Sequence, residues 1–202
     1  MGSPSADLVI AILAAGASSR MRGGDKLLEP VEGRPLLRLL AERAVTLGLP
    51  VIVTLPPDAP ARHAALGGIQ ARPLVVPDAA TGMAASFRAL AREVPEETAL
   101  MIVLGDMPEI TSDDMGRIVD AWRADGGLRV ARATTRDGSE GQPLILPARL
   151  VPALRGLEGD RGARAVVAGE DNVKVPLPGS RATVDLDTPE AWAAWRADGP
   201  SR

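Results

Sequence analysis

The most constraining feature of this sequence is an apolar run near its start that gives way abruptly to very small residues. Leu8 to Leu13 reads LVIAIL, an unbroken hydrophobic stretch of strand length, which is typical of a parallel strand buried on both faces. Ala14, Ala15 and Gly16 follow and have almost no side chain, so a ligand can approach the backbone closely. A small-residue turn after a buried strand predicts an open α/β sheet that binds a ligand at its strand ends.

Polar and cationic side chains continue this turn. Ser18 and Ser19 add hydroxyl groups, and Arg20, Arg22 and Lys26 add positive charges. Backbone N–H groups in a small-residue turn, together with fixed cations, suit the oxygens of a polyphosphate. The stretch is neither a Walker A loop nor a Gly-x-Gly-x-x-Gly dinucleotide loop. We predict a phosphate-binding loop, with an ordinary Gly/Ser-rich loop carrying surface cations as the alternative.

The composition limits the chemistry that is open to the chain. Its 202 residues include no cysteine, and His63 is the only histidine. Thiolate catalysis, zinc–thiolate sites and histidine metal clusters are therefore excluded, and metal chemistry must use carboxylates, which favour Mg²⁺ or Mn²⁺. The net charge of −3 predicts no nucleic-acid partner. No apolar run reaches the roughly 18 residues of a membrane span, and MGSPSAD lacks a secretory pattern, so we expect no membrane partner and a cytoplasmic location.

A carboxylate follows the second strongly apolar run. Residues 99 to 104 read ALMIVL, which predicts the central strand, and Gly105 and Asp106 come directly after it. An acid at the carboxyl edge of an open sheet suits a Mg²⁺ that bridges the phosphates of a nucleoside triphosphate. The alternative is an Asp that caps the next helix, but Thr111 and Ser112 already offer an N-cap for residues 113 to 124.

Two further acids alternate near the C-terminus, in ATVDLDTPEAW. In an extended chain Asp185 and Asp187 would point the same way. Thr188 and Pro189 then predict a helix start, which Asp187 could also support. A separate helix is predicted from Gly82, and the hydrophobic spacing of that helix leaves Ser86 without an assigned role.

Strands and helices alternate along most of the chain. The predicted strands are 8–13, 51–55, 73–76, 99–104, 128–133, 143–146 and 173–177, and helices are predicted at 35–47, 59–66, 82–90, 113–124, 149–154, after 159–164, and from 188. This pattern predicts one domain over residues 1–202, a three-layer α/β fold whose sheet is mostly parallel with an antiparallel excursion near residues 128 to 146.

Several of these stretches together resemble one family. LAAGASSRM, ending at Met21, with Lys26 a few residues on, is similar to the signature of the MobA-like nucleotidyltransferases. The LAAG form and KLLEPVEGRPLL resemble molybdenum cofactor cytidylyltransferases within that group. GMAASFR, GQPLIL, GDRGAR and DLDTPEA resemble further elements of the family. The resemblance implies a Rossmann-like, GT-A-like nucleotidyltransferase fold.

The resemblance also implies an activity and roles for residues. The activity would be Mg²⁺-dependent transfer of CMP from CTP to molybdopterin with release of pyrophosphate, and a molybdoenzyme or its chaperone would be a candidate partner. The implied roles are catalysis by Arg20, Lys26 and Asp106; metal binding by Asp106 and Asp185; nucleotide binding by Leu13, Ala14, Ala15, Gly16, Ser18, Ser19, Lys26, Gly82 and Ser86; and acceptor binding by Gly141, Gln142, Asp160, Arg164 and Asp187. Asp187 stays open as the alternative second metal ligand.

Three alternatives remain. Arg22 lengthens the spacing from Arg20 to Lys26 toward that of the guanylyl branch. GTP therefore remains an alternative donor, and a sugar or alcohol phosphate remains an alternative acceptor. A non-catalytic nucleotide-binding regulator is disfavoured because binding alone does not require two carboxylates. A nicotinamide-type oxidoreductase is disfavoured by the missing Gly-x-Gly-x-x-Gly motif.

Overall fold

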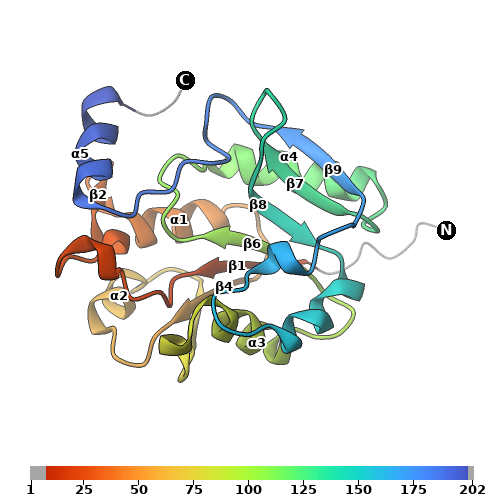
Figure 1. Ribbon diagram of the computed structural model, residues 1–202, viewed down its shortest axis with the longest axis horizontal. Coiled ribbons are helices and arrows are strands. Elements are labelled where there is room, and N and C mark those ends of the chain that lie inside the picture. Colours follow the sequence, from red (N-terminus) through yellow and green to blue (C-terminus); the bar gives the residue numbers. More distant parts are fainter. Residues whose placement is uncertain (1–7, 200–202) are drawn as a thin grey trace.

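The computed structural model describes residues 8–199. Its centre is a seven-stranded sheet in the order β5-β4-β1-β6-β8-β7-β9, and β2 and β3 form a separate hairpin (Figure 1). The strands are β1 (Leu8–Leu13), β2 (Pro30–Val31), β3 (Arg34–Pro35), β4 (Val51–Leu55), β5 (Arg72–Val75), β6 (Ala99–Leu104), β7 (Val130–Thr134), β8 (Glu140–Leu146) and β9 (Asn172–Pro176).

The sheet is parallel on one side and mixed on the other. β5, β4, β1 and β6 pair in parallel, whereas β8 runs antiparallel to both β6 and β7. The two apolar runs lie side by side at the centre, in a register that pairs Leu8 with Ala99 and Leu13 with Leu104. Both strands are buried up to their last residue, as parallel strands covered on both faces must be. The predicted fold, with its antiparallel excursion at β8, is confirmed.

Helices cover both faces of the sheet and form the outer layers (Figure 1). One core cluster packs α1 and α4 against the sheet through Leu40 and Trp122, and another packs α3 and η4 through Phe87 and Leu154. The helices are α1 (Leu36–Val45), α2 (Pro60–Ala65), α3 (Met83–Glu93), α4 (Ser112–Ala124) and α5 (Pro189–Asp198), and the 3₁₀ segments are η1 (Ser19–Met21), η2 (Lys26–Leu28), η3 (Ala79–Thr81), η4 (Ala148–Gly156) and η5 (Ala163–Ala165). Between residues 8 and 199, no helix has the length and apolar character needed to cross a membrane.

Two local predictions were wrong, and one element was not predicted. The helix expected after residues 159 to 164 is only the short turn η5. β8 begins at Glu140, before the predicted start, because Glu140 pairs with Thr134 of β7 in the antiparallel register. The hairpin of β2 and β3 was not predicted; its turn places Glu32 and Gly33 at φ values of 52° and 75°, the left-handed conformation that tight hairpins need.

Candidate active site

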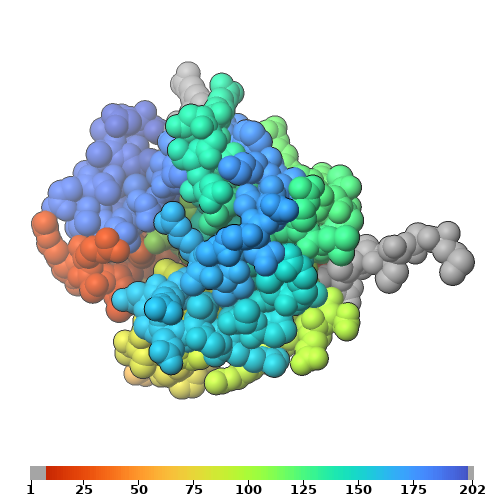
Figure 2. Space-filling model, turned by 45° about the vertical axis from the view of Figure 1, so that its right-hand side comes forward, coloured from red at the N-terminus to blue at the C-terminus, as the bar shows by residue number. Residues whose placement is uncertain are grey.

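A cavity of about 380 Å³ opens at the carboxyl ends of β1 and β6. Figure 2 shows the surface hollowed where the red N-terminal segments, the blue C-terminal segment and the cyan loop near residue 160 approach one another. Most of the residues predicted for the site line this cavity: Leu13, Ala15, Gly16, Arg20, Lys26, Gly82, Ser86, Asp106, Asp160, Asp185 and Asp187. The sheet therefore gathers side chains from opposite ends of the sequence at the edge where open α/β sheets bind ligands.

Lys26 occupies the centre of this cluster. Its Nζ donates to Asp106 Oδ2 and to Asp187 Oδ1, each at 2.6 Å, and only 15% of its side chain is exposed. Arg20 pairs with the other oxygen of Asp187 at 2.8 Å. Burial by itself lowers the pKa of Lys26, but the charges and hydrogen bonds of Asp106 and Asp187 outweigh burial and raise that pKa above its ordinary value. Lys26 is therefore a fixed cation next to two acids.

Asp185 and Asp106 are close enough for their negative charges to act on each other. Burial raises the pKa of the Asp185 carboxyl, and the charges of Asp106 and Asp187 raise it further. Oδ1 of Asp106 is buried and has no hydrogen-bond partner in the described part of the chain. An orphaned carboxylate oxygen beside a second carboxylate fits a divalent cation.

The protein alone does not supply a complete metal shell. Within residues 8–199, no group of three or more His, Cys, Asp or Glu side chains has an arrangement that could hold a metal ion. Mg²⁺ commonly binds through one or two carboxylates and completes its octahedron with water and substrate phosphate oxygens. The pair Asp106 and Asp185 fits that mode, whereas both oxygens of Asp187 already bind Lys26 and Arg20.

The glycines of the site fall into two groups. A Cβ on Gly82 would lie 2.5 Å from the carbonyl oxygen of Gly159, and a Cβ on Gly141 would lie 1.9 Å from that of Ala182, so protein packing explains both residues. A Cβ on Gly16 would meet no heavy atom within 4 Å. The missing side chain of Gly16 leaves space that the protein itself does not use, as a ligand-binding loop would require.

Other predicted site residues lie outside the cavity. The hydroxyl of Ser18 contacts Asp25 and the Arg62 guanidinium, and Ala14 is buried with its N–H directed at Thr54. Neither these two nor four further predicted residues line the cavity: Ser19, Gly141, Gln142 and Arg164.

Asp160 and Asp187, which were predicted to bind the acceptor, both line the cavity. Asp160 lines the cavity beside Gly82, at the start of α3, where an added Cβ on Gly82 would be 2.7 Å from Asp160 Oδ1. Asp187 holds the two cations described above.

The sequence reasoning missed Arg62. This side chain comes from α2, is 5% exposed, and donates hydrogen bonds to the carbonyl oxygens of Ala14 and Gly16 in the loop after β1. The signal that could have pointed to it is Asp25, an acid directly before Lys26 in a loop whose other charges are cations.

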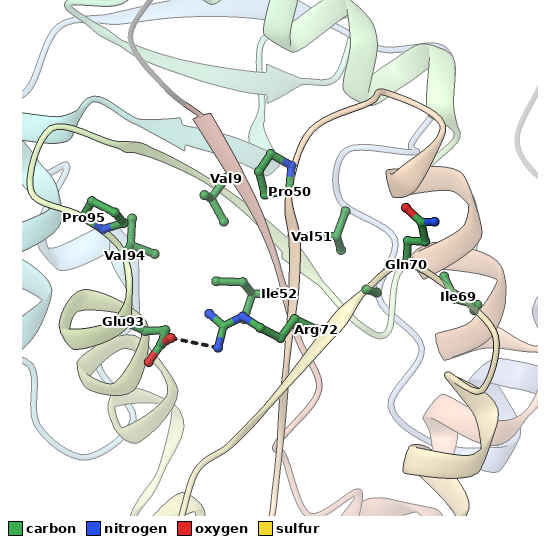
Figure 3. A pocket seen from close by; sticks show the side chains of 11 residues that line it. Val9, Pro50, Val51, Ile52, Ile69, Gln70, Arg72, Glu93, Val94 and Pro95 are labelled. Carbon is green, nitrogen blue, oxygen red and sulfur yellow. Dashed lines mark ion pairs between the residues drawn. The ribbon is translucent and has the colours of Figure 1, made fainter.

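A separate cavity of about 490 Å³ lies at the amino-terminal edge of β1 and β4 (Figure 3). It is lined mostly by apolar side chains such as Val9 and Ile52, and its charged groups Arg72 and Glu93 pair with each other at 2.8 Å. It holds none of the predicted site residues and lies opposite the strand ends where such sheets bind ligands. We therefore place the functional site at the carboxyl edge.

The geometry defines an α/β protein with a ligand cavity at the carboxyl ends of its parallel strands, where a cationic loop faces the carboxylates of Asp106 and Asp185. The model of the MobA-like NTP transferase domain matches residues 10–175. The nicotine blue oxidoreductase of Paenarthrobacter nicotinovorans is 30% identical over 159 residues, which cover 76% of this chain and 78% of that protein. The chain belongs to the MobA-like NTP transferase family.

Solved structures agree with this assignment. Rv0371c from Mycobacterium tuberculosis H37Rv superposes with a TM-score of 0.80 at 25% identity, covering 95% of this chain and 98% of that one. A structure of Rv0371c in complex with manganese superposes with a TM-score of 0.74 at 26% identity, covering 93% and 97% of the two chains. The fold is therefore that of a nucleotidyltransferase, and one similar protein has been solved with a divalent metal.

Proposed function

We propose that this protein transfers CMP from CTP to molybdopterin, with Mg²⁺ or Mn²⁺ as cofactor and pyrophosphate as the second product. The observation that carries the proposal is the orphaned Oδ1 of Asp106, which lies near the carboxylate of Asp185 and in the same cavity as a loop with unused N–H groups. A pair of carboxylates suits triphosphate chemistry, because Mg²⁺ binds through one or two carboxylates together with substrate phosphates.

The residues of the site have distinct tasks in this reaction. Asp106 and Asp185 would hold the divalent cation, which supplies charge neutralisation on the triphosphate. An oxygen of the acceptor phosphate attacks the α-phosphorus and forms the new P–O bond, while the bond to the bridging oxygen breaks and pyrophosphate leaves with the electron pair. Arg20 and Lys26 neutralise the α-phosphate and the leaving group. The attacking phosphate is already ionised near neutral pH, so no general base is needed.

The choice of CTP rests on the sequence resemblance of the LAAG and KLLEPVEGRPLL stretches. The residue that lengthens the loop, Arg22, has a left-handed φ of 51° and pairs at 2.7 Å with Glu190 at the start of α5. Both side chains are well exposed, and neither lines the cavity. The extra residue is therefore accommodated at the surface, which supports the cytidylyl reading and leaves GTP as the alternative donor.

A second candidate is an oxidoreductase. It is favoured by the 30% identity to a protein named nicotine blue oxidoreductase. Hydride transfer does not require two acids, a lysine and an arginine around one cavity, which is why we rank transferase chemistry first.

One assay distinguishes the candidates. Purified protein is incubated with Mg²⁺, molybdenum-bearing molybdopterin and each of the four NTPs in turn, and pyrophosphate is quantified. Preference for CTP supports the proposal, and preference for GTP moves the protein to the guanylyl branch. If no NTP yields pyrophosphate, and the protein instead oxidises a reduced nicotinamide cofactor in the presence of a dye acceptor, the oxidoreductase candidate replaces the transferase proposal.

A further inference from the structure

Arg62 is a buried charge that the proposed reaction does not use. Its guanidinium carries five N–H donors, and five hydrogen bonds are made. Nε donates to Asp25 Oδ2 at 2.6 Å, and one terminal nitrogen donates to the carbonyl oxygens of Ala14 and Gly16 at 2.7 and 2.8 Å. The other terminal nitrogen donates to Asp25 Oδ1 at 2.9 Å and to Ser18 Oγ at 3.1 Å. All five N–H donors of Arg62 therefore bind acceptors in the loop between β1 and η2.

These contacts fix the direction of the loop's peptide groups. In a trans peptide the C=O and the following N–H point in opposite directions, and the only cis peptide in residues 8–199 is Gln142–Pro143. Because Arg62 holds the carbonyls of Ala14 and Gly16, the N–H groups of Ala15 and Ala17 point away from Arg62.

Those N–H groups have no competing acceptor. Across residues 8–199, the N–H groups of Ala15, Gly16 and Ala17 donate no hydrogen bond, and all three residues line the cavity that holds Lys26. A run of free N–H groups on one side of a loop forms a concavity that binds anions.

The same contact reaches Lys26. Asp25 Oδ1 also accepts the N–H of Leu27 at 3.0 Å and so caps η2, the turn that begins at Lys26. The ion pair between Arg62 and Asp25 therefore joins the loop that carries the free N–H groups to the turn that carries the ammonium group.

We infer that Arg62 is a positioning residue for triphosphate binding. It turns the loop carbonyls away from the cavity, leaves the N–H groups of Ala15 and Ala17 for phosphate oxygens, and sets the distance from that loop to Lys26. The inference rests on the proposed function, because it takes a triphosphate as the ligand of the loop. Lysine cannot replace arginine here, since an ammonium group lacks the planar fork that reaches a carboxylate and two carbonyls together.

The test compares Arg62→Lys and Arg62→Ala with Arg38→Ala. Arg38 is a matched control: it also donates to two carbonyl oxygens around the end of α2, those of Ala65 and Gly67, both at 3.1 Å, but it does not touch the loop. For Arg62→Lys we expect kcat/KM for CTP to fall by about 100-fold, mostly through KM, because small displacements of positioning groups cost about that much. Arg38→Ala should keep the wild-type value.

Chemical rescue separates positioning from a general effect on folding. Arg62→Ala leaves a hole of guanidinium shape, so low millimolar guanidinium should restore part of its activity and should not change Arg38→Ala. If Arg62→Ala does not fold, the KM of Arg62→Lys decides. An unchanged KM in Arg62→Lys, or equal losses in the Arg62 and Arg38 variants, would overturn the inference.

A binding readout keeps this inference separate from the reaction itself. Inorganic tripolyphosphate should raise the melting temperature of the wild type and of Arg38→Ala, but not that of Arg62→Lys. If this pattern holds while no NTP yields pyrophosphate, the role of Arg62 stands and the proposed reaction fails. If the wild type binds neither tripolyphosphate nor any NTP, both fail.

Discussion

Replacing Asp106 by Asn tests the metal assignment at little cost to the fold. The substitution weakens the hydrogen bond from Lys26, which in its charge-assisted form is worth about 1.5–3 kcal/mol, because the acceptor becomes neutral. Asn retains an oxygen acceptor, Lys26 keeps its 2.6 Å contact with Asp187, and the repulsion felt by Asp185 is relieved. We expect a net loss of about 1 kcal/mol, or about 2–4 °C in melting temperature for a chain of this size.

The effect of the same substitution on turnover should be far larger. Loss of a single preorganised electrostatic group costs about 100- to 1,000-fold, and here the metal would lose one of its two carboxylates, so pyrophosphate release should fall by at least about 1,000-fold. Melting curves and a continuous pyrophosphate assay on the same preparation measure both quantities. An unchanged rate in Asp106→Asn would show that the metal assignment is wrong.

Asp114 provides the matched control for this experiment. Asp114 is more deeply buried than Asp106, and it closes the capping box of α4 with Thr111 and pairs with Arg181 at 3.4 Å, outside the cavity. Asp114→Asn should lower the melting temperature, because capping interactions contribute about 1 kcal/mol, and should leave kcat/KM at its wild-type value. Similar losses of stability in the two variants, with loss of turnover in Asp106→Asn alone, would separate folding from catalysis.

Three further predictions follow from the cavity. Asp185→Asn should abolish the rise in melting temperature that Mn²⁺ is expected to cause in the wild type. Asp187→Asn should keep that rise but should increase KM for CTP by about tenfold, because Lys26 and Arg20 lose their shared partner. The reverse pattern would make Asp187 the metal ligand. Gly16→Ala should leave the melting temperature within about 1 °C and raise KM for CTP, and a normal KM would show that no ligand approaches there. Treatment with EDTA should stop pyrophosphate release, and Mg²⁺ or Mn²⁺ should restore it; turnover that persists in EDTA would argue against a metal-dependent reaction.

The central strands were predictable because their sequences allow few other structures. LVIAIL and ALMIVL are too apolar for a surface and too short for most helices, and both lie in the middle of the sheet as β1 and β6. The position of Asp106 then followed from the strand that ends directly before it.

The shared direction of the Asp185 and Asp187 side chains could also be predicted from the sequence. Leu186 lies between them, is 5% exposed, and its N–H donates to the carbonyl oxygen of Asp106 at 3.1 Å, while both acids face the cavity. An apolar residue between two acids fixes which way an extended segment turns, so local sequence is sufficient there.

The contacts of Arg62 were not predictable for a physical reason. Its acceptors lie 37 to 48 residues away in the chain, and they include backbone carbonyls, which carry no signature in the sequence. The start of β8 was missed for a different reason: residues 136 to 142 are rich in turn-forming residues, and this composition does not show that Glu140 pairs with Thr134 of β7. Periodicity reports which faces of helices and strands are buried, and it does not report which long side chain crosses to another segment.

The most direct test of the account is a phosphorus NMR experiment on the wild-type protein with CTP, Mg²⁺ and molybdenum-bearing molybdopterin. The account predicts that pyrophosphate and a new diphosphate-linked product accumulate in equal amounts as CTP disappears, and that the Asp106→Asn protein produces neither. Release of orthophosphate without a new diphosphate signal, or no change with any of the four NTPs, would contradict nucleotidyl transfer at this site.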